Sequence, residues 1–360
     1  MTDTPFATRS SCFDSFGYED FDPERVRALS DWKKCPIGGC DLDAITIGVK
    51  RRSRIPVCAT HGIRLHAGTF VYWNGMENEV AARLRNIQMR PDLAKKFVEG
   101  KTGKVESGRL GYEMSEDALS WNVFVGLKEG GGLGKAVSHL CGAMPSREPD
   151  LYLWGFGIVD RAEPPRTFSP LDEVRGCLEE GIRKFVTEPD IMLVVPGELL
   201  VCIEAKFGSG NPLAHPGKNA EGEKPTDVDG LLDRYLSPKA EAARSAIDRA
   251  EVKAPLHTQL FRNVVFASEM AALAGIRDWR VVNLVGKTLW EAKKVKKQSA
   301  GYSLEDPTPE VKRYLRAGHH HRFSFRSWEG LFGDVLKNIP AVASYVASKS
   351  AHFRPAFNLK

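Results

Sequence analysis

Two carboxylates and a lysine stand at the ends of two apolar runs near the middle of the chain. Asp190 directly precedes the run Ile191 to Val195. Glu204 and Lys206 directly follow the run Leu199 to Ile203. Carboxylates suit Mg²⁺, which completes its shell with water and phosphate oxygens, and a nearby ammonium group offsets charge on phosphorus. The pattern indicates hydrolysis of a phosphate ester. The structural alternative is a Glu204–Lys206 ion pair, with Asp190 as a turn residue.

The two apolar runs predict two strands joined by a tight turn. Pro196 and Gly197 follow the first run and are turn-forming residues. Runs that are apolar at every position are typical of strands covered on both faces, as in a sheet between helices. Because side chains alternate along a strand, Glu204 and Lys206 point to the same face and Ala205 points away.

The length of the turn decides whether Asp190 and Glu204 share a face. In an antiparallel pair, directly opposed residues project to the same face, and a slip of one residue reverses the strand. A two-residue turn would point Glu204 away from Asp190. A three-residue turn, Pro196 to Glu198, pairs Val195 with Leu199 and restores the shared face. We predict an odd-numbered connection, or a compensating bulge, because L-Pro-Gly fits the favoured two-residue hairpin turns poorly.

Pro189-Asp190 followed by Glu204-Ala205-Lys206 resembles the PD-(D/E)XK nuclease superfamily, which has the restriction-endonuclease-like fold. The resemblance implies that Asp190 and Glu204 bind a catalytic Mg²⁺ together with the backbone carbonyl of Ala205. It implies that Lys206 positions or activates the attacking water. The implied activity is hydrolysis of phosphodiester bonds.

The same resemblance implies functional residues on helices beside the sheet. Nucleases of this superfamily often carry an acidic residue on the helix before the sheet, where Glu116 is the candidate and Glu173 and Glu180 are alternatives. They often carry Gln or Arg on the helix after the second strand, where Gln259 and Arg262 fit by order. Acidic residues at a helix start are also ordinary capping residues. Gln259 and Arg262 would equally suit a solvated helix face.

Four potential zinc ligands form two close pairs in the N-terminal part of the chain. Cys35 and Cys40 enclose two glycines, and Cys58 is soon followed by His61. Thiolate and imidazole groups are the usual ligands of tetrahedral structural zinc. The arrangement resembles a zinc ribbon, although four residues instead of two separate the first cysteines. His66 is an alternative fourth ligand, and a loop region with buried free cysteines is the structural alternative.

A basic tip, Lys50, Arg51 and Arg52, lies between the two pairs of zinc ligands. Such a tip can contact nucleic-acid phosphates, although a solvated turn is the ordinary role of a short basic run. The net charge of the chain is only +5. This charge permits nucleic-acid binding without requiring it, so local basic patches would supply the electrostatic attraction.

Composition points to a globular protein of the cytoplasm. The hydrophobic fraction is 42% and the charged fraction 27%. No apolar run approaches the length of a membrane span, and the first residues lack the basic and apolar segments of a secretory signal. The seven cysteines are unevenly spread, which favours metal binding in a reducing compartment over disulfides.

We therefore expect an α/β protein whose restriction-endonuclease-like core has a central mixed sheet flanked by helices, next to a small zinc-ribbon-like module. The expected segments are an N-terminal arm over 1–34, the zinc module over 35–75, a helical connector over 76–111, the nuclease core over 112–290 and a basic extension over 291–360.

The expected function is Mg²⁺-dependent cleavage of DNA by an endonuclease of restriction or phage defence, with structural Zn²⁺ in the N-terminal module. DNA is the expected partner, and a homodimer is consistent with cutting a duplex. One alternative is a non-catalytic, zinc-containing nucleic-acid-binding protein. Another is a structure-specific or RNA-directed nuclease of repair or processing.

Overall fold

The computed structural model describes most of the chain in two compact units. The first unit comprises Met1–Gly126 and Leu336–Lys360, and the second comprises Leu127–Val335. The described residues are 18–27, 34–40, 45–49, 53–58, 60–66, 69–72, 80–100, 109–159, 166–183, 186–214, 222–294, 301–352 and 359. The boundary between the units falls inside the helix α4, Glu116–Glu129.

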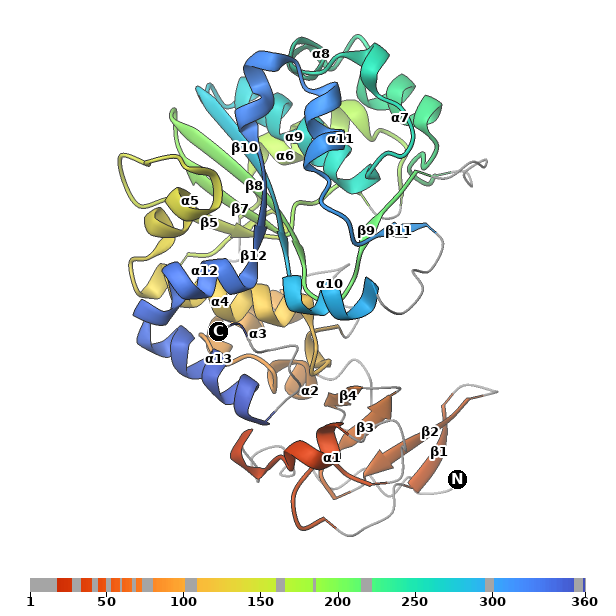
Figure 1. Cartoon of the computed structure of the whole chain (residues 1–360), viewed down its shortest axis with the longest axis vertical. Helices are drawn as coiled ribbons and strands as arrows, with labels where there is room; N and C mark the ends of the chain where they lie inside the picture. The colour runs from red at the N-terminus through yellow and green to blue at the C-terminus, as the bar shows by residue number, and fades with distance from the viewer. Residues whose placement is uncertain are drawn as a thin grey trace. The chain divides into compact units, whose positions relative to one another are not determined.

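The second unit is built on a six-stranded mixed sheet in the order β12-β10-β8-β7-β5-β6 (Figure 1). Strands β6, β5, β7 and β8 pair antiparallel, whereas β8, β10 and β12 run parallel. The expected α/β class with a central mixed sheet is thus confirmed. The strands are β5 (Asp150–Leu153), β6 (Phe156–Gly157), β7 (Ile191–Val195), β8 (Leu199–Lys206), β10 (Asp278–Val285) and β12 (Phe323–Ser327).

Strands β7 and β8 are buried at every position, as their uninterrupted apolar sequences predict. Met192 and Cys202 belong to a continuous apolar core together with residues of the long helix α9, Thr258–Leu273. This helix packs on β8 and β10, and α6, Ser169–Leu178, packs on α9. The apolar faces of strands and helices therefore hold the hairpin rigidly at the centre of the unit.

The β7–β8 hairpin has the predicted odd-numbered connection. Val195 pairs with Leu199, so the loop has three residues, Pro196 to Glu198. Gly197 has a φ of +71°, a left-handed conformation that favours glycine. The amide of Glu198 donates to the carbonyl of Val195 at 2.9 Å and closes the turn.

Further helices and a two-stranded ribbon complete the second unit. The helix α5, Leu133–Cys141, packs against β10 and β12. The ribbon pairs β9, Asn211–Pro212, with β11, Tyr302–Ser303. The remaining helices are α7 (Val228–Tyr235), α8 (Glu241–Ala246), α10 (Lys287–Lys294), α11 (Thr308–Tyr314) and α12 (Trp328–Asp334), with 3₁₀ turns at Arg249–Glu251 and Ala317–Arg322.

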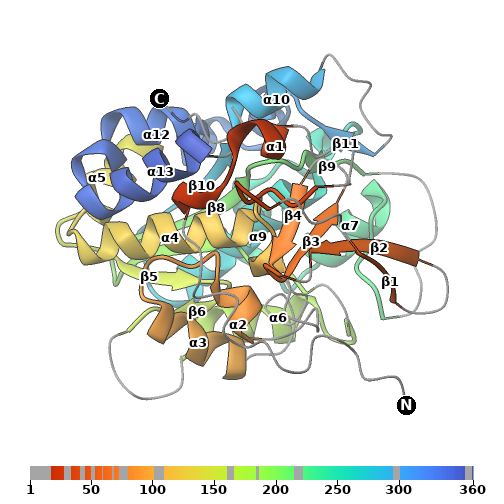
Figure 2. The ribbon, with the colours of Figure 1, turned by 90° about the horizontal axis from the view of Figure 1, so that it is seen from below.

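The first unit contains a four-stranded antiparallel sheet in the sequential order β1-β2-β3-β4 (Figure 2). Its strands are β1 (Ile45–Val49), β2 (Ser53–Cys58), β3 (Ile63–His66) and β4 (Thr69–Tyr72). Its helices are α1 (Pro23–Arg27), α2 (Val80–Leu84), α3 (Pro91–Gly100), the start of α4 and α13 (Pro340–His352), with 3₁₀ turns at Tyr18–Asp20, Arg109–Gly111 and Leu336–Asn338. The helix α4 begins after Ser115, whose hydroxyl accepts the Ala118 amide at 3.0 Å.

A buried lysine joins the C-terminal helix to the rest of the first unit. Lys349 of α13 is completely buried, and its ammonium donates to the carbonyl of Glu113 at 2.8 Å and to Asn86 Oδ1 at 3.2 Å. These bonds compensate the burial of the charge and link the end of the chain to residues before α4. Throughout the described ranges, no helix combines the length and apolar composition that a bilayer crossing requires.

Candidate active site and metal centre

The hairpin brings two buried carboxylates and a buried lysine to the same end of β7 and β8. Ile191 pairs with Ile203, so the next position outward sets Asp190 opposite Glu204. Lys206 lies two residues beyond Glu204 and shares its side of β8. The three side chains are buried, with 5%, 2% and 6% of their residue surface exposed.

Both carboxylate oxygens of Glu204 have partners. Lys206 Nζ lies 2.5 Å from Oε1, and Asn263 Nδ2 donates to Oε2 at 2.8 Å. Asn263 is buried on α9, the helix that covers this part of the sheet. A buried carboxylate is stable only when charge and hydrogen bonds compensate its lost hydration, and these two groups provide both.

The side chain of Asp190 continues the hydrogen-bond ladder where β7 begins. Its Oδ2 accepts the backbone amide of Ala205 at 3.0 Å, and its carbonyl accepts the amide of Trp154 at 3.1 Å. These contacts hold the Asp190 carboxylate against the end of β8. Two carboxylates at one strand end match the number that Mg²⁺ commonly takes from a protein.

A pair of asparagines, which sequence analysis did not single out, supports the backbone of Glu204. Asn283 of β10 lies opposite Glu204 in the parallel register, and its Nδ2 donates to the Glu204 carbonyl at 3.3 Å. Asn211 Nδ2 donates to Asn283 Oδ1 at 2.8 Å. Both amides are fully buried. The signal for Asn283 was a lone amide in the apolar strand WRVVNLV.

Gln259 and Arg262 lie on α9, as expected, but it is the neighbouring Asn263 that donates to Glu204. Arg262 is buried and Gln259 is half-buried. Burial and then the nearby Glu179 carboxylate raise the pKa of Tyr235, while the charge of Arg262 opposes that rise. Arg262 is therefore close enough to act electrostatically on this tyrosine.

Glu179 is a buried carboxylate that sequence analysis missed. It accepts the backbone amide of Thr187 at 2.7 Å and the hydroxyl of Tyr235 at 2.7 Å. It joins the end of α6 to the segment entering β7. The alternatives Glu173 and Glu180 on the same stretch are exposed. Glu179 differs from Glu173 and Glu180 in being buried. The composition of the segment does not specify which of its positions are buried.

Glu116 begins α4 in the first unit, whereas the hairpin belongs to the second. It is half-buried and, together with Asp117, lies in the first helical turn after the Ser115 cap. Acidic residues in this position interact favourably with the helix dipole. The basic tip Lys50, Arg51 and Arg52 lies outside the described residues.

The predicted zinc ligands Cys35, Cys40, Cys58 and His61 converge in the first unit. Their ligand atoms all lie within 4.8 Å of one another. Cys58 ends β2, and the loop between the first two cysteines turns through Gly39 at a φ of +72°. Within the described residues, these four side chains lie close enough together to share one metal ion.

The distances within the cluster suit tetrahedral coordination. Zn–S bonds of about 2.3 Å and Zn–N bonds of about 2.0 Å imply separations of about 3.8 Å between sulfurs and about 3.5 Å between sulfur and nitrogen. The sulfurs of Cys40 and Cys58 are 3.9 Å apart. His61 Nδ1 lies 3.5 Å from the sulfurs of Cys35 and Cys58. The cluster can therefore hold one metal ion such as zinc.

Local charge and backbone contacts favour this arrangement. The contact with Cys35, opposed by burial and supported by His61, lowers the pKa of Cys58, while the same contact and burial raise the pKa of Cys35. The thiolate that metal binding needs is therefore favoured at one cysteine of this pair. Arg25 donates to the carbonyls of Ile37 at 3.1 Å and Cys40 at 2.6 Å. The helix α1 thus fixes the loop that carries the first two ligands.

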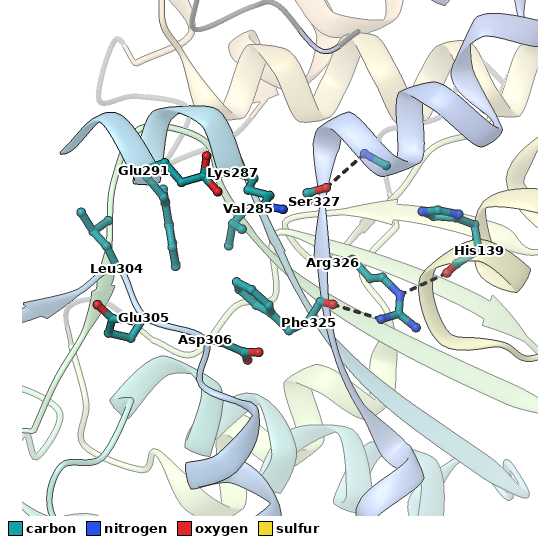
Figure 3. A pocket seen from close by; sticks show the side chains of 12 residues that line it. His139, Val285, Lys287, Glu291, Leu304, Glu305, Asp306, Phe325, Arg326 and Ser327 are labelled. Carbon is teal, nitrogen blue, oxygen red and sulfur yellow. Dashed lines mark hydrogen bonds between the residues drawn. The ribbon is translucent and has the colours of Figure 1, made fainter. Parts of the chain in front are cut away.

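A pocket of about 420 Å³ opens in the second unit where β10 and β12 end. Figure 3 shows Phe325 and Leu304 between two groups of charged side chains, Lys287 with Glu291 and Glu305 with Asp306. Arg326 donates to the carbonyls of His139 at 3.3 Å and Phe325 at 3.1 Å.

Comparisons with known proteins identify no relative: no family model, curated protein or solved structure matches the chain.

Proposed function

We propose that the protein is a Mg²⁺-dependent nuclease that hydrolyses phosphodiester bonds in DNA. The observation that carries this proposal is the burial of Asp190, Glu204 and Lys206 together at one end of the hairpin. An apolar hairpin needs no charged group there for its own stability. Burying three such groups costs free energy unless they compensate one another. A function at this site would explain why the chain keeps them.

Asp190, Glu204 and the carbonyl of Ala205 would hold the metal ion. When bound, Mg²⁺ supplies a Lewis acid for a phosphoryl oxygen and lowers the pKa of a coordinated water. Each carboxylate oxygen can accept two hydrogen bonds or ligands, so the contacts of Glu204 with Lys206 and Asn263 leave lone pairs for a cation.

Lys206 would orient the attacking water and offset charge at phosphorus. Its ammonium group has three donors, one of which is directed at Glu204. A charge fixed in a buried site stabilises the transition state more strongly than the same charge in water, because it needs no reorganisation. Asn263 would keep Glu204 in one rotamer while the lysine acts.

DNA is the proposed substrate, and defence by restriction, which the resemblance of the hairpin motif suggests, is the proposed setting. A homodimer would let one site per chain cut both strands of a duplex. The basic isoelectric point of about 8.7 is compatible with a polyanionic substrate. The metal cluster of the first unit would hold a structural Zn²⁺ that stabilises its fold.

A second candidate is a non-catalytic nucleic-acid-binding protein. The observation that favours it is the complete pairing of Glu204 with Lys206 and Asn263, which is stable without a cation. In that case the three charges would form an internal ion-pair network, and the metal cluster would belong to a recognition module.

Cleavage assays separate these functions. Purified protein is incubated with duplex, branched and single-stranded DNA and with RNA, in Mg²⁺ or in EDTA. The proposal expects Mg²⁺-dependent cleavage of DNA that Lys206→Met abolishes. Lys239→Met, which removes an exposed lysine paired with Glu180, is the matched control. Cleavage that persists undiminished in Lys206→Met would refute the mechanism, and cleavage of RNA alone would refute the substrate.

A further inference from the structure

The pocket beside β10 lies close to the proposed catalytic lysine. Lys206, Val285 and Ser327 occupy corresponding positions on three neighbouring parallel strands. Neighbouring strands are about 5 Å apart, so the pocket begins one strand away from Lys206. The amide of Gly286 also donates to the Lys206 carbonyl at 2.8 Å. Anything held in the pocket would therefore lie beside the proposed reaction centre.

The inner wall of the pocket is aromatic and apolar. Trp290 and Phe325 have ring centroids 6.0 Å apart and an interplanar angle of 43°. Trp290 Nε1 donates to the carbonyl of Ser209 at 3.1 Å, which fixes the indole to the segment that follows β8. Leu304 and Val285 also line the pocket. Such walls accept a flat, weakly hydrated group.

The charged groups around this wall favour a ligand that donates hydrogen bonds over a phosphate group. The lining includes the carboxylates of Glu291, Glu305 and Asp306 against the cations of Lys287 and Arg326. The carboxylates accept hydrogen bonds and repel anions. Arg326 is directed to the carbonyls of His139 and Phe325.

The nearby N-terminus of α10, where a phosphate could bind backbone amides, is already capped. The Glu329 carboxylate accepts the amides of Lys287 at 3.1 Å and Thr288 at 2.9 Å. This protein carboxylate takes the position that an anionic ligand would need. Phosphate is therefore an unsuitable occupant of this side of the pocket.

We propose that the pocket binds one unstacked nucleobase that carries an exocyclic amino group. The base would stack on Phe325 and donate its amino hydrogens to Glu305 or Asp306, whose side chains lie on one side of that ring (Figure 3). Cytosine N4 and adenine N6 are donors of this kind, whereas thymine presents a carbonyl at the same place. The inference rests on the proposed function and adds a base-binding subsite to it.

The size and position of the pocket agree with this occupant. Its volume of about 420 Å³ lies within the range of small-ligand sites, and a single base is smaller than the ligands that such sites hold. Aromatic stacking is the usual way in which proteins hold a base extruded from a strand. A base held here would fix the adjoining phosphate relative to Lys206.

Ligand-observed NMR titration of the full chain tests the inference without a cleavage step. The probes are deoxycytidine, thymidine and inorganic phosphate, in buffer without Mg²⁺. We expect saturable binding of deoxycytidine, affinity for thymidine lower by about tenfold, and no competition by phosphate. Phe325→Ala should abolish deoxycytidine binding. The double variant Glu305→Gln/Asp306→Asn should weaken it about tenfold.

The double variant should stay folded. In the wild type Asp306 accepts the Thr308 amide at 2.8 Å, and the side-chain oxygen of Asp306→Asn can accept the same bond. Glu241→Gln, which alters an exposed carboxylate on α8, is the control and should bind deoxycytidine normally. Equal affinity for thymidine, competition by phosphate or no saturable nucleoside binding overturns the inference. Deoxycytidine binding by a protein that cleaves nothing would refute the nuclease function and support the subsite.

Discussion

Asn263 and Glu204 are 59 residues apart in sequence and are joined by a buried hydrogen bond of 2.8 Å. The bond runs from the helix α9 to the end of β8 and holds one carboxylate oxygen while Lys206 holds the other. A carboxylate that is hydrogen-bonded at both oxygens keeps one orientation at the end of β8. Such preorganisation is what the proposed metal-dependent reaction would require of its ligands.

Lys206→Met and Asp190→Ala should each abolish cleavage of DNA. Removing the charge beside the water or a metal carboxylate should lower the rate by about a thousandfold or more. Steady-state cleavage assays with each purified variant measure this loss. Circular dichroism should show a folded protein in both cases, and a folded Asp190→Ala variant with the wild-type rate would exclude the carboxylate from catalysis.

Asn263→Ala should lower kcat by about ten- to a hundredfold while the KM for DNA stays unchanged. The amide orients Glu204 without contacting substrate, so its loss should affect the transition state more than binding. The Mg²⁺ concentration needed for half-maximal rate should rise. Ser268→Ala, which removes a buried hydroxyl that donates to the Val265 carbonyl of the same helix, is the control. A change in KM alone would argue against a positioning role.

One zinc ion per chain should be bound by the cluster in the first unit. Elemental analysis should find stoichiometric zinc in the wild type and less in Cys35→Ser. Because structural zinc contributes directly to folding, that variant should also expose residues 35–70 to protease. Cys177→Ser, at an exposed free cysteine elsewhere, should keep its metal. Metal-free wild type with a protease-resistant first unit would contradict the assignment.

The free energy of unfolding should rise with pH between about 8 and 10.5 because of Lys349. Burial lowers the pKa of this lysine from 10.5 to about 8, and the nearby Glu113 opposes the shift. Within that window the unfolded chain binds more protons than the folded one, so stability increases with pH, by about 3 kcal/mol at most.

Urea denaturation at several pH values measures this slope. The rise should be smaller in Lys349→Met than in wild type. Lys337→Met, which removes an exposed lysine from the same C-terminal segment, should retain the wild-type slope. Identical slopes in wild type and Lys349→Met would show that the lysine keeps its proton on folding.

Gly286→Ala should disturb the strand ends beside the proposed site. A Cβ atom at this position would lie 2.7 Å from the carbonyl oxygen of Phe207, so the backbones after β8 and β10 would have to separate. We expect a loss of about 1 to 3 kcal/mol in unfolding free energy together with slower cleavage. Gly176→Ala on α6 meets no atom within 4 Å and should be neutral or slightly stabilising.

The local features of this protein were readable in its sequence. The uninterrupted apolar runs predicted β7 and β8, and the poor fit of Pro-Gly to a two-residue turn predicted the register that sets Asp190 opposite Glu204. Two short-range pairs of ligands predicted the cluster of Cys35, Cys40, Cys58 and His61. Each of these predictions depends on the alternation of side chains along a strand or on the spacing of residues within a short segment. A few neighbouring residues determine either of them.

The partners that complete the sites were decided by tertiary structure. Asn263, Asn283 and Glu179 lie on different elements from the groups that they contact, and their sequence neighbourhoods resemble ordinary helix faces or strands. The union of residues 336–360 with the first unit likewise joins distant parts of the chain. Such contacts depend on how helices dock on the sheet, and docking depends on the complementarity of whole surfaces, which no short stretch of sequence contains.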